Sequence, residues 1–187
     1  GDKRTFEPGL DDAALAKVEG RHKMRADAAE EMKKLLAAVR EDLKAAKKRG
    51  LRHAKRVSRI GLASAYRNPV EDLVAWQNAF ASLYAVTAKE RQALLGGEHG
   101  DKAARFMVSK MYGLKAIPGF SNHTNGIAVD FTTTEDGTRL GPKKRQASLW
   151  RGAWLYEWLQ HHGDEYSYVE LSTEEWHWDY RPASTSS

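Results

Sequence analysis

Two short segments in the second half of the chain carry histidine and acidic side chains at close spacing. In the first segment, His123 precedes Asp130 by seven residues, and in the second, Glu174 precedes His177 by three. Two imidazoles, one carboxylate and a spare glutamate match the needs of a catalytic zinc site, which uses three N/O ligands, a position for water and a general base. The chain is therefore expected to adopt a fold that brings these two distant segments together, and this requirement limits the possible folds more than any other feature of the sequence.

Each of these residues also has a purely structural interpretation. Asp130 lies in an apolar run, residues 127–131, where a charge is costly unless it is paired or metal-bound. It could instead cap a turn at the end of a strand, and His123 could be a solvated loop histidine. His177 lies between Trp176 and Trp178 and could belong to an aromatic core. The metal interpretation is favoured because one site accounts for all three residues.

A third segment, Ser64-Ala65-Tyr66-Arg67, precedes the other two. With Ser-x-His-x-x-Gly-x-Ala-x-Asp at 121–130 and Glu-x-Trp-His at 174–177, the chain resembles the zinc D-alanyl-D-alanine carboxypeptidase and dipeptidase family. That family includes phage L-alanyl-D-glutamate endolysins, and its members cut peptidoglycan stem peptides. The resemblance covers about residues 56–181 and leaves the N-terminal part of the chain unexplained.

The resemblance implies a single site with three kinds of residue. These are the Zn²⁺ ligands His123, Asp130 and His177, the catalytic residues Glu174 and Arg67, and the substrate-binding residues Ser121, Tyr66 and Trp176. On a regular strand Glu174 and His177 would point to opposite faces, so the segment must bend between them. Glu175 is the alternative general base. The family often has a glutamine soon after the arginine, but here the nearest is Gln77, which receives no role.

Composition narrows the possible functions further. The 187 residues are 41% hydrophobic and include no cysteine, so a thiolate metal site and a disulfide framework are excluded. The formal net charge is +5, which favours anionic partners in general. The basic stretch 47–56 lacks a nucleic-acid-binding motif and interleaved aromatic residues, so no nucleic-acid partner is expected. No apolar stretch is long enough to span a membrane.

The expected activity is hydrolysis of peptidoglycan stem peptides by a monomeric zinc peptidase at the bacterial cell wall. Whether the enzyme trims a terminal residue or cuts within the stem is left open. A non-catalytic zinc-containing binding module of the same fold is the alternative function. Residues 1–5 do not form a signal peptide, and a first residue other than Met suggests either a processed product or a shortened chain, from which an export signal could have been lost.

The order of apolar patterns predicts an α+β fold, with a small, mostly antiparallel sheet packed against helices. We expect an N-terminal helical extension over 1–55, a peptidase domain over 56–182 and a disordered tail over 183–187. The extension would begin with a helix at Ala13, capped by Asp11 or Asp12. Its second helix, 26–48, would pack on the peptidase domain or serve as a partner-binding or wall-binding arm. Further expected elements are strands at 57–64, 126–132, 166–171 and 175–180 and helices at 69–86, 87–96, 101–112 and 147–162.

Overall fold

The computed structural model describes residues 9–114, 118 and 121–182. The chain divides into two compact units. The first, which we call the sheet unit, is formed by Leu10–Arg67 and by the chain after Thr124. The second, the helical insert, is formed by Asn68–Thr124. The expected tail at 183–187 lies outside the described residues.

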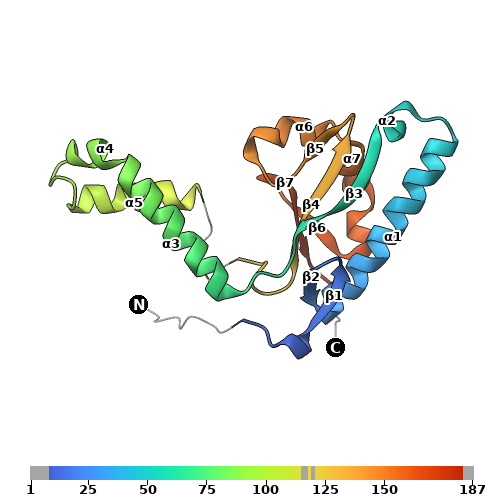
Figure 1. The fold of residues 1–187 in the computed structure, drawn as a ribbon, viewed down its shortest axis with the longest axis horizontal. Coiled ribbons are helices and arrows are strands. Elements are labelled where there is room, and N and C mark those ends of the chain that lie inside the picture. Colours follow the sequence, from blue (N-terminus) through green and yellow to red (C-terminus); the bar gives the residue numbers. More distant parts are fainter. Residues whose placement is uncertain (1–8, 115–117, 119–120, 183–187) are drawn as a thin grey trace. The chain divides into compact units, whose positions relative to one another are not determined.

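The sheet unit is built on a five-stranded sheet in which every pairing is antiparallel (Figure 1). The strands follow the order β3-β4-β7-β6, and β5 pairs with β4. Their bounds are β3 Val57–Ser64, β4 Ala128–Glu135, β5 Thr138–Leu140, β6 Tyr168–Leu171 and β7 Glu174–Tyr180. Together with the helices, this arrangement confirms the predicted α+β class.

Alternate residues of the two central strands face opposite sides of the sheet, as the pleat requires. On one side, β4 places Val129 and Phe131 in the hydrophobic core, and β7 adds Trp176 and Trp178. The intervening residues Asp130, His177 and Asp179 therefore lie on the other face. The sequence alternation thus separates a core face from a polar face that carries the candidate site.

Two helices cover the core face. The first, α1 (Ala26–Lys48), buries an apolar stripe that includes Met32, Leu35 and Val39. The second, α7 (Trp154–His162), contributes to the same core and meets α1 where the Trp158 Nε1 donates to Asp42 Oδ2 at 2.9 Å. The predicted helix at 26–48 is confirmed, and it packs on the sheet rather than projecting as an arm.

The predicted helix beginning at Ala13 is wrong. A single 3-10 turn at Asp12–Ala14 leads into a hairpin of β1 (Leu15–Glu19) and β2 (His22–Arg25). Gly20 takes a φ of +55° at the hairpin turn, which favours glycine. Met24 on β2 is fully buried, so tertiary packing of one strand face overrides the local capping signal.

The predicted single helix at 147–162 is also wrong. The structure has α6 (Ala147–Arg151), a break at Gly152 and Ala153, and then α7. The buried carboxylate of Glu135, from β4, accepts hydrogen bonds from the backbone N–H groups of Trp154 and Leu155 at 3.0 and 3.4 Å. Glu135, which is distant in sequence, therefore caps the start of α7, so that a second helix begins at Trp154.

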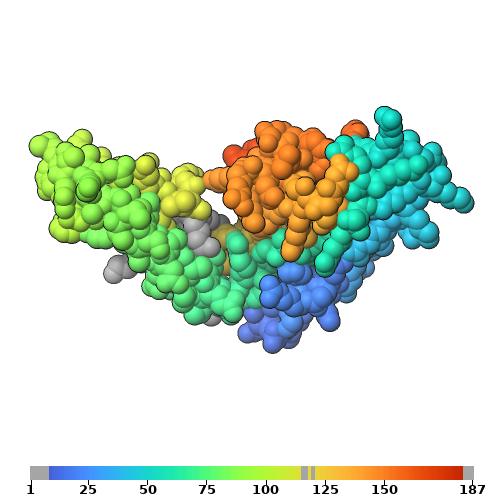
Figure 2. All heavy atoms as spheres, turned by 45° about the horizontal axis from the view of Figure 1, so that its top comes forward, coloured from blue at the N-terminus to red at the C-terminus, as the bar shows by residue number. Residues whose placement is uncertain are grey.

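The short α2 (Arg52–Lys55) lies against the residues that follow α6, and in the space-filling view the teal and orange surfaces adjoin there (Figure 2). The Nε2 of His53 lies 3.0 Å from the carbonyl oxygen of Gly152. Two further 3-10 turns occupy Lys144–Gln146 and Gly163–Tyr166.

The helical insert contains α3 (Pro69–Val86), α4 (Ala88–Gln92) and α5 (Asp101–Tyr112). The Oδ1 of Asn68 accepts the Val70 N–H at 2.9 Å, and Pro69 occupies the first helical position. The predicted start of α3 is thus confirmed together with its physical cause.

Candidate metal centre

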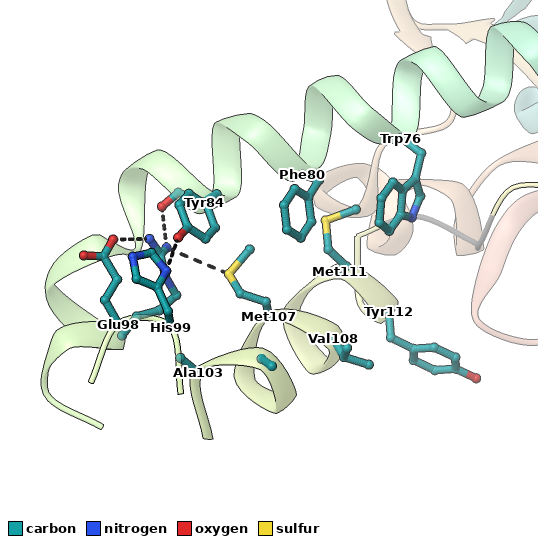
Figure 3. A pocket seen from close by; sticks show the side chains of 12 residues that line it. Trp76, Phe80, Tyr84, Glu98, His99, Ala103, Met107, Val108, Met111 and Tyr112 are labelled. Carbon is teal, nitrogen blue, oxygen red and sulfur yellow. Dashed lines mark hydrogen bonds and ion pairs between the residues drawn. The ribbon is translucent and has the colours of Figure 1, made fainter. Parts of the chain in front are cut away.

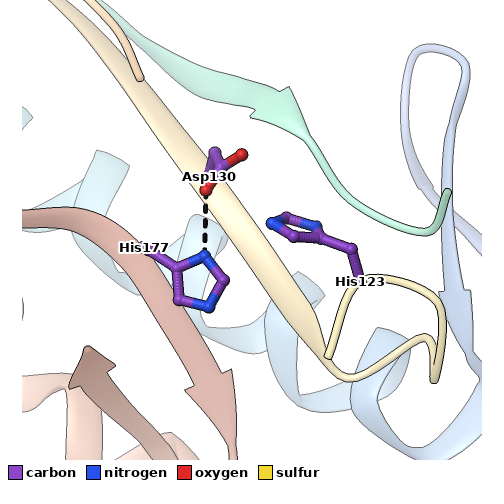
Figure 4. A group of neighbouring side chains, drawn as sticks. All are labelled: His123, Asp130 and His177. Carbon is purple, nitrogen blue, oxygen red and sulfur yellow. Dashed lines mark hydrogen bonds and ion pairs between the residues drawn. The ribbon is translucent and has the colours of Figure 1, made fainter. Parts of the chain in front are cut away.

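Three predicted ligands come together at one point of the structure. His123, Asp130 and His177 each offer a ligand atom, and these atoms all lie within 4.8 Å of one another (Figure 4). The three residues are only 2%, 5% and 7% exposed. Among the described residues this is the one such group of three or more possible metal ligands. Burial of this many polar groups at one point needs compensating interactions, which a bound cation would supply.

The sheet register accounts for two of the three positions. Asp130 on β4 pairs with His177 on β7, so both side chains leave the same face at neighbouring strands. On its other side, Asp130 pairs with Ser64 at the end of β3, close to the Ser-Ala-Tyr-Arg motif. The central strand therefore brings all three sequence motifs to one end of the sheet.

His123 lies in the loop that precedes β4, and two local features shape this loop. The Ser121 Oγ accepts the His123 N–H at 3.3 Å, and the Ser121 carbonyl accepts the Thr124 N–H at 2.9 Å. Gly126 then takes a φ of +68°, and an added Cβ would lie 2.8 Å from the Arg25 backbone nitrogen. Ser121 thus supports the loop, and its predicted contact with substrate stays a prediction.

The N-terminal hairpin forms backbone hydrogen bonds with two of the motif segments, those at 64–67 and 121–130. The Arg25 N–H donates to the Gly126 carbonyl, and the Tyr66 N–H donates to the Lys23 carbonyl, both at 2.9 Å. Sequence reasoning missed this support because a helix, not a hairpin, was expected to begin at Ala13. The alternation that leaves Met24 buried on β2 was the available signal.

His177 is hydrogen-bonded through both ring nitrogens. Its Nδ1 lies 3.1 Å from Asp130 Oδ1, and its Nε2 lies 3.0 Å from Asp179 Oδ1. Burial by itself lowers the pKa of His177, but hydrogen bonds and attraction to Asp130 and Asp179 outweigh it and raise the pKa to about 9. The Asp179 contact engages Nε2 and directs Nδ1 toward Asp130, so Nδ1 is the nitrogen available as a ligand.

Asp179 is itself held by a cation. The guanidinium of Arg181 contacts Asp179 Oδ2 at 3.3 Å, and Asp179 is 3% exposed. A carboxylate that orients a ligating histidine is a recurrent feature of zinc sites. The sequence motifs assigned no role to Arg181. Alternation along β7 places His177 and Asp179 on one face, and Arg181 follows at the same two-residue spacing just beyond the end of the strand; this spacing was the available signal.

The two candidate bases have different surroundings. Glu175 is buried and forms an ion pair with Arg151. Glu174 is half-buried at the start of β7. In the β6–β7 pairing, Glu170 is opposite Trp178 but Leu171 is opposite Glu174, so residues 175–177 have no counterparts on β6. The β6–β7 register is therefore irregular between Glu174 and His177, and the assignment of Glu174 as base stays a prediction.

The remaining predicted site residues lie on or beside the same strands. Arg67 follows the end of β3 by three residues and is half-buried, as is Tyr66. The Tyr66 hydroxyl is buried and has no hydrogen-bond partner in the described structure. Trp176 is 3% exposed and belongs to the core. The catalytic and substrate-binding roles of these residues stay predictions.

The donor set fits zinc. Zinc sites with three protein ligands use histidine nitrogen and carboxylate oxygen, and they keep one further position for water. Two buried imidazoles and one buried carboxylate within 4.8 Å supply those atoms. The His/Asp/His cluster and the antiparallel sheet that carries it are together typical of one class of protein, the His/Asp zinc hydrolases with an α+β fold.

Comparisons with known proteins agree with this class. The family model described as VanY, D-alanyl-D-alanine carboxypeptidase, matches residues 21–183. A zinc-bound mutant of the D,D-pentapeptidase VanY is similar in fold, with a TM-score of 0.50 and 17% identity over 89% of this chain and 77% of that one. The LD-carboxypeptidase LdcB reaches a TM-score of 0.53 and 20% identity over 91% and 69%. No curated protein sequence matches the chain.

Because the match spans most of its length, the chain belongs to the D-alanyl-D-alanine carboxypeptidase (VanY) family. It is accordingly an enzyme of the peptidoglycan-hydrolase class, as the three motifs predicted. The solved structures, at 17% and 20% identity, support the fold. In the described part of the chain, no helix has the length and apolar character that crossing a membrane requires.

Proposed function

We propose that this protein is a zinc peptidase that hydrolyses peptidoglycan stem peptides at the bacterial cell wall, with Glu174 as general base. The supporting observation is the buried cluster of His123, Asp130 and His177, whose ligand atoms lie within 4.8 Å of one another. Zinc held by these residues would lower the pKa of a bound water, so that the water can act as a nucleophile near neutral pH. It would also polarise the peptide carbonyl as a Lewis acid.

Glu174 would accept the proton of the attacking water and return it to the leaving amine. The irregular register of β7 after Glu174 supports this role, because Glu174 and His177 then need not follow strict strand alternation. Glu175 is less suited because Arg151 already neutralises its charge. Arg67 would stabilise the negative charge that develops on the carbonyl oxygen, or bind a substrate carboxylate, through its planar pair of N–H donors.

The test is to incubate the zinc-loaded protein with purified muropeptides and to identify the products by mass. Glu174→Gln should reduce cleavage by about 10²–10⁴-fold while zinc stays bound. Glu175→Gln is the matched control and should retain most of the activity. Equal losses in the two variants, or none in Glu174→Gln, would move the base elsewhere. A wild-type protein that binds zinc and cleaves nothing would instead be a binding module.

Arg67 allows the endopeptidase and carboxypeptidase alternatives to be separated. Peptides with a free C-terminal carboxylate are compared with their amidated forms, in the wild type and in Arg67→Gln. If Arg67 binds a terminal carboxylate, the wild type should prefer the free acid, and the variant should lose that preference. Equal cleavage of both forms by the wild type would indicate an endopeptidase, with Arg67 directed to the reacting carbonyl.

A further inference from the structure

The helical insert leaves much apolar surface uncovered. Ten large hydrophobic residues of the described chain are exposed, and seven of them belong to the insert: Val70, Val74, Val86, Leu95, Val108, Tyr112 and Leu114. Scattered exposed hydrophobic residues are normal, but a concentration in one unit indicates a surface that contacts something else. The only buried residues of the 18-residue α3 are Pro69 and Asp72, so an apolar helix lies largely open.

Between α3 and α5 runs a hollow of about 430 Å³, which we call the α3–α5 trough (Figure 3). On α3, the rings of Trp76, Phe80 and Tyr84 form a stacked series with centroids 5.5 and 5.9 Å apart. On α5, Met107 and Met111 are buried in the floor, whereas Val108 and Tyr112 are 69% and 82% exposed. A hollow of this size and lining accommodates an aliphatic chain.

The charged end of the trough is already neutralised. The Arg91 guanidinium lies over the Tyr84 ring, 3.5 Å from its centroid, and donates to Glu98 at 2.7 Å. The Tyr84 hydroxyl lies 2.8 Å from His99 Nδ1. These contacts compensate the charge of Arg91, so an anionic group would find its partner elsewhere on the insert.

That partner is on the outer side of α5. The helix carries Lys102, Arg105 and Lys110 but a single acid, Asp101, at its N-terminus. A second hollow of about 410 Å³ is lined by Ala104, Arg105, Val108, Ser109 and Tyr112. It shares Ala104, Val108 and Tyr112 with the trough. Arg105 therefore meets the exposed apolar side chains of Val108 and Tyr112 at this hollow, and Lys102 precedes it by three residues on the same helix.

We propose that the helical insert binds an anionic phospholipid surface. An acyl chain would occupy the α3–α5 trough, and lipid phosphates would contact Arg105 and Lys102 on the outer side of α5. Charge complementarity selects this partner, because a basic edge beside apolar and tyrosine side chains is the pattern of peripheral helices on anionic bilayers. Tyr112 presents an apolar ring with a polar tip, which suits the headgroup region. This inference is independent of the peptidase activity.

The experiment is sedimentation of the full, zinc-loaded chain with phosphatidylcholine vesicles, with or without phosphatidylglycerol. The wild type should bind the anionic vesicles, and binding should weaken as salt rises. The double variant Val108→Ser/Tyr112→Ser and the double variant Lys102→Gln/Arg105→Gln should each reduce the partition coefficient by about tenfold or more. Binding should also slow hydrogen exchange in residues 101–112.

Matched controls replace residues of the same type in the sheet unit. Val169→Ser tests loss of an exposed valine, and Lys33→Gln/Lys48→Gln tests loss of two exposed charges; both should bind as the wild type does. Unchanged zinc binding and far-UV circular dichroism in the insert variants would show that they fold. With folded variants, the vesicle measurements decide for or against the proposal.

Three results of the vesicle measurements would overturn the proposal. The first is no binding to anionic vesicles, and the second is equal binding to neutral and anionic vesicles. The third is binding that persists in both insert variants. If light scattering instead shows a concentration-dependent dimer that Val108→Ser/Tyr112→Ser abolishes, the trough is an interface between two copies of the chain, which also overturns the lipid proposal.

Discussion

At the scale of single residues, His177 is the most strongly coupled group of the site. Its two nitrogens lie about equally close to Asp130 and Asp179, at 3.1 and 3.0 Å. In metal-free protein, both carboxylates favour the doubly protonated ring. A metal at Nδ1 would replace one proton and retain the Asp179 contact. Metal and proton therefore compete for the same atom.

This competition predicts how the stability of the metal-free protein depends on pH. The pKa of His177 rises to about 9 in the folded state, above its ordinary value of 6.5. Its stabilising contribution is therefore complete below pH 6.5 and is lost as pH rises through about 9. Each unit of pKa difference corresponds to about 1.4 kcal/mol in the free energy of unfolding. Urea midpoints of the metal-free protein at pH 6, 8 and 10 should decline, and the decline should be smaller in His177→Gln.

Asp179 provides a second prediction at this scale. Asp179→Asn keeps the size of the side chain and an oxygen that can accept the His177 N–H, but it removes the negative charge. Zinc affinity, measured by competition with a chromophoric chelator, should fall by about 10–100-fold. The control Asp136→Asn changes an exposed carboxylate paired with Arg56 and should leave zinc affinity unchanged. Wild-type affinity in Asp179→Asn would mean that Asp179 does not position His177.

At the scale of elements, the N-terminal hairpin connects the scaffold to the site. Through backbone hydrogen bonds, β2 holds Gly126, in the loop before β4, and Tyr66, just beyond β3. Gly126 has both a positive φ and a close neighbour, so a side chain at this position meets strain and a clash together. The hairpin is therefore part of the structure that positions His123.

Gly126→Ala tests this connection. The variant should lose about 1–3 kcal/mol of unfolding free energy, and it should bind zinc more weakly because the loop carrying His123 must move. Gly137→Ala is the matched control, since Gly137 has a φ of +74° but no atom within 4 Å of an added Cβ. It should show the conformational cost alone, with unchanged zinc affinity. Urea unfolding and zinc titration of both variants measure the difference.

At the scale of the whole molecule, the two units differ in how their helices are stabilised. α1 buries seven residues, whereas α3 buries two and α5 three. Local opening is easier where few apolar side chains are buried. Without lipid, amides of α3 and α5 should exchange with deuterium faster than those of α1 and β4, as mass spectrometry of peptic fragments would measure. Equal protection in all four elements would contradict this difference.

Particular elements show how far sequence reasoning reached. The helix at 26–48 and the start of α3 at Pro69 were predictable because apolar spacing and an Asn-Pro cap are local signals. The hairpin at 15–25 was not, because the capping signal at Asp11 and Asp12 was local while the burial of Met24 is tertiary. The single helix expected at 147–162 is instead two helices, and Glu135 from β4 caps the start of the second one. Each error arose where a long-range contact overrode a local preference.

The sequence by itself determined the chemistry of the site. Residue types and spacing in two motifs, together with the family resemblance, indicated the ligands His123, Asp130 and His177. Only the tertiary structure decided how these side chains are held: Asp179 and Arg181 contact one another behind His177, and the hairpin supports Gly126. The physical reason is that periodicity and propensity act between near neighbours in the chain, whereas strand register, burial and hydrogen bonds between distant segments exist only once the chain has folded.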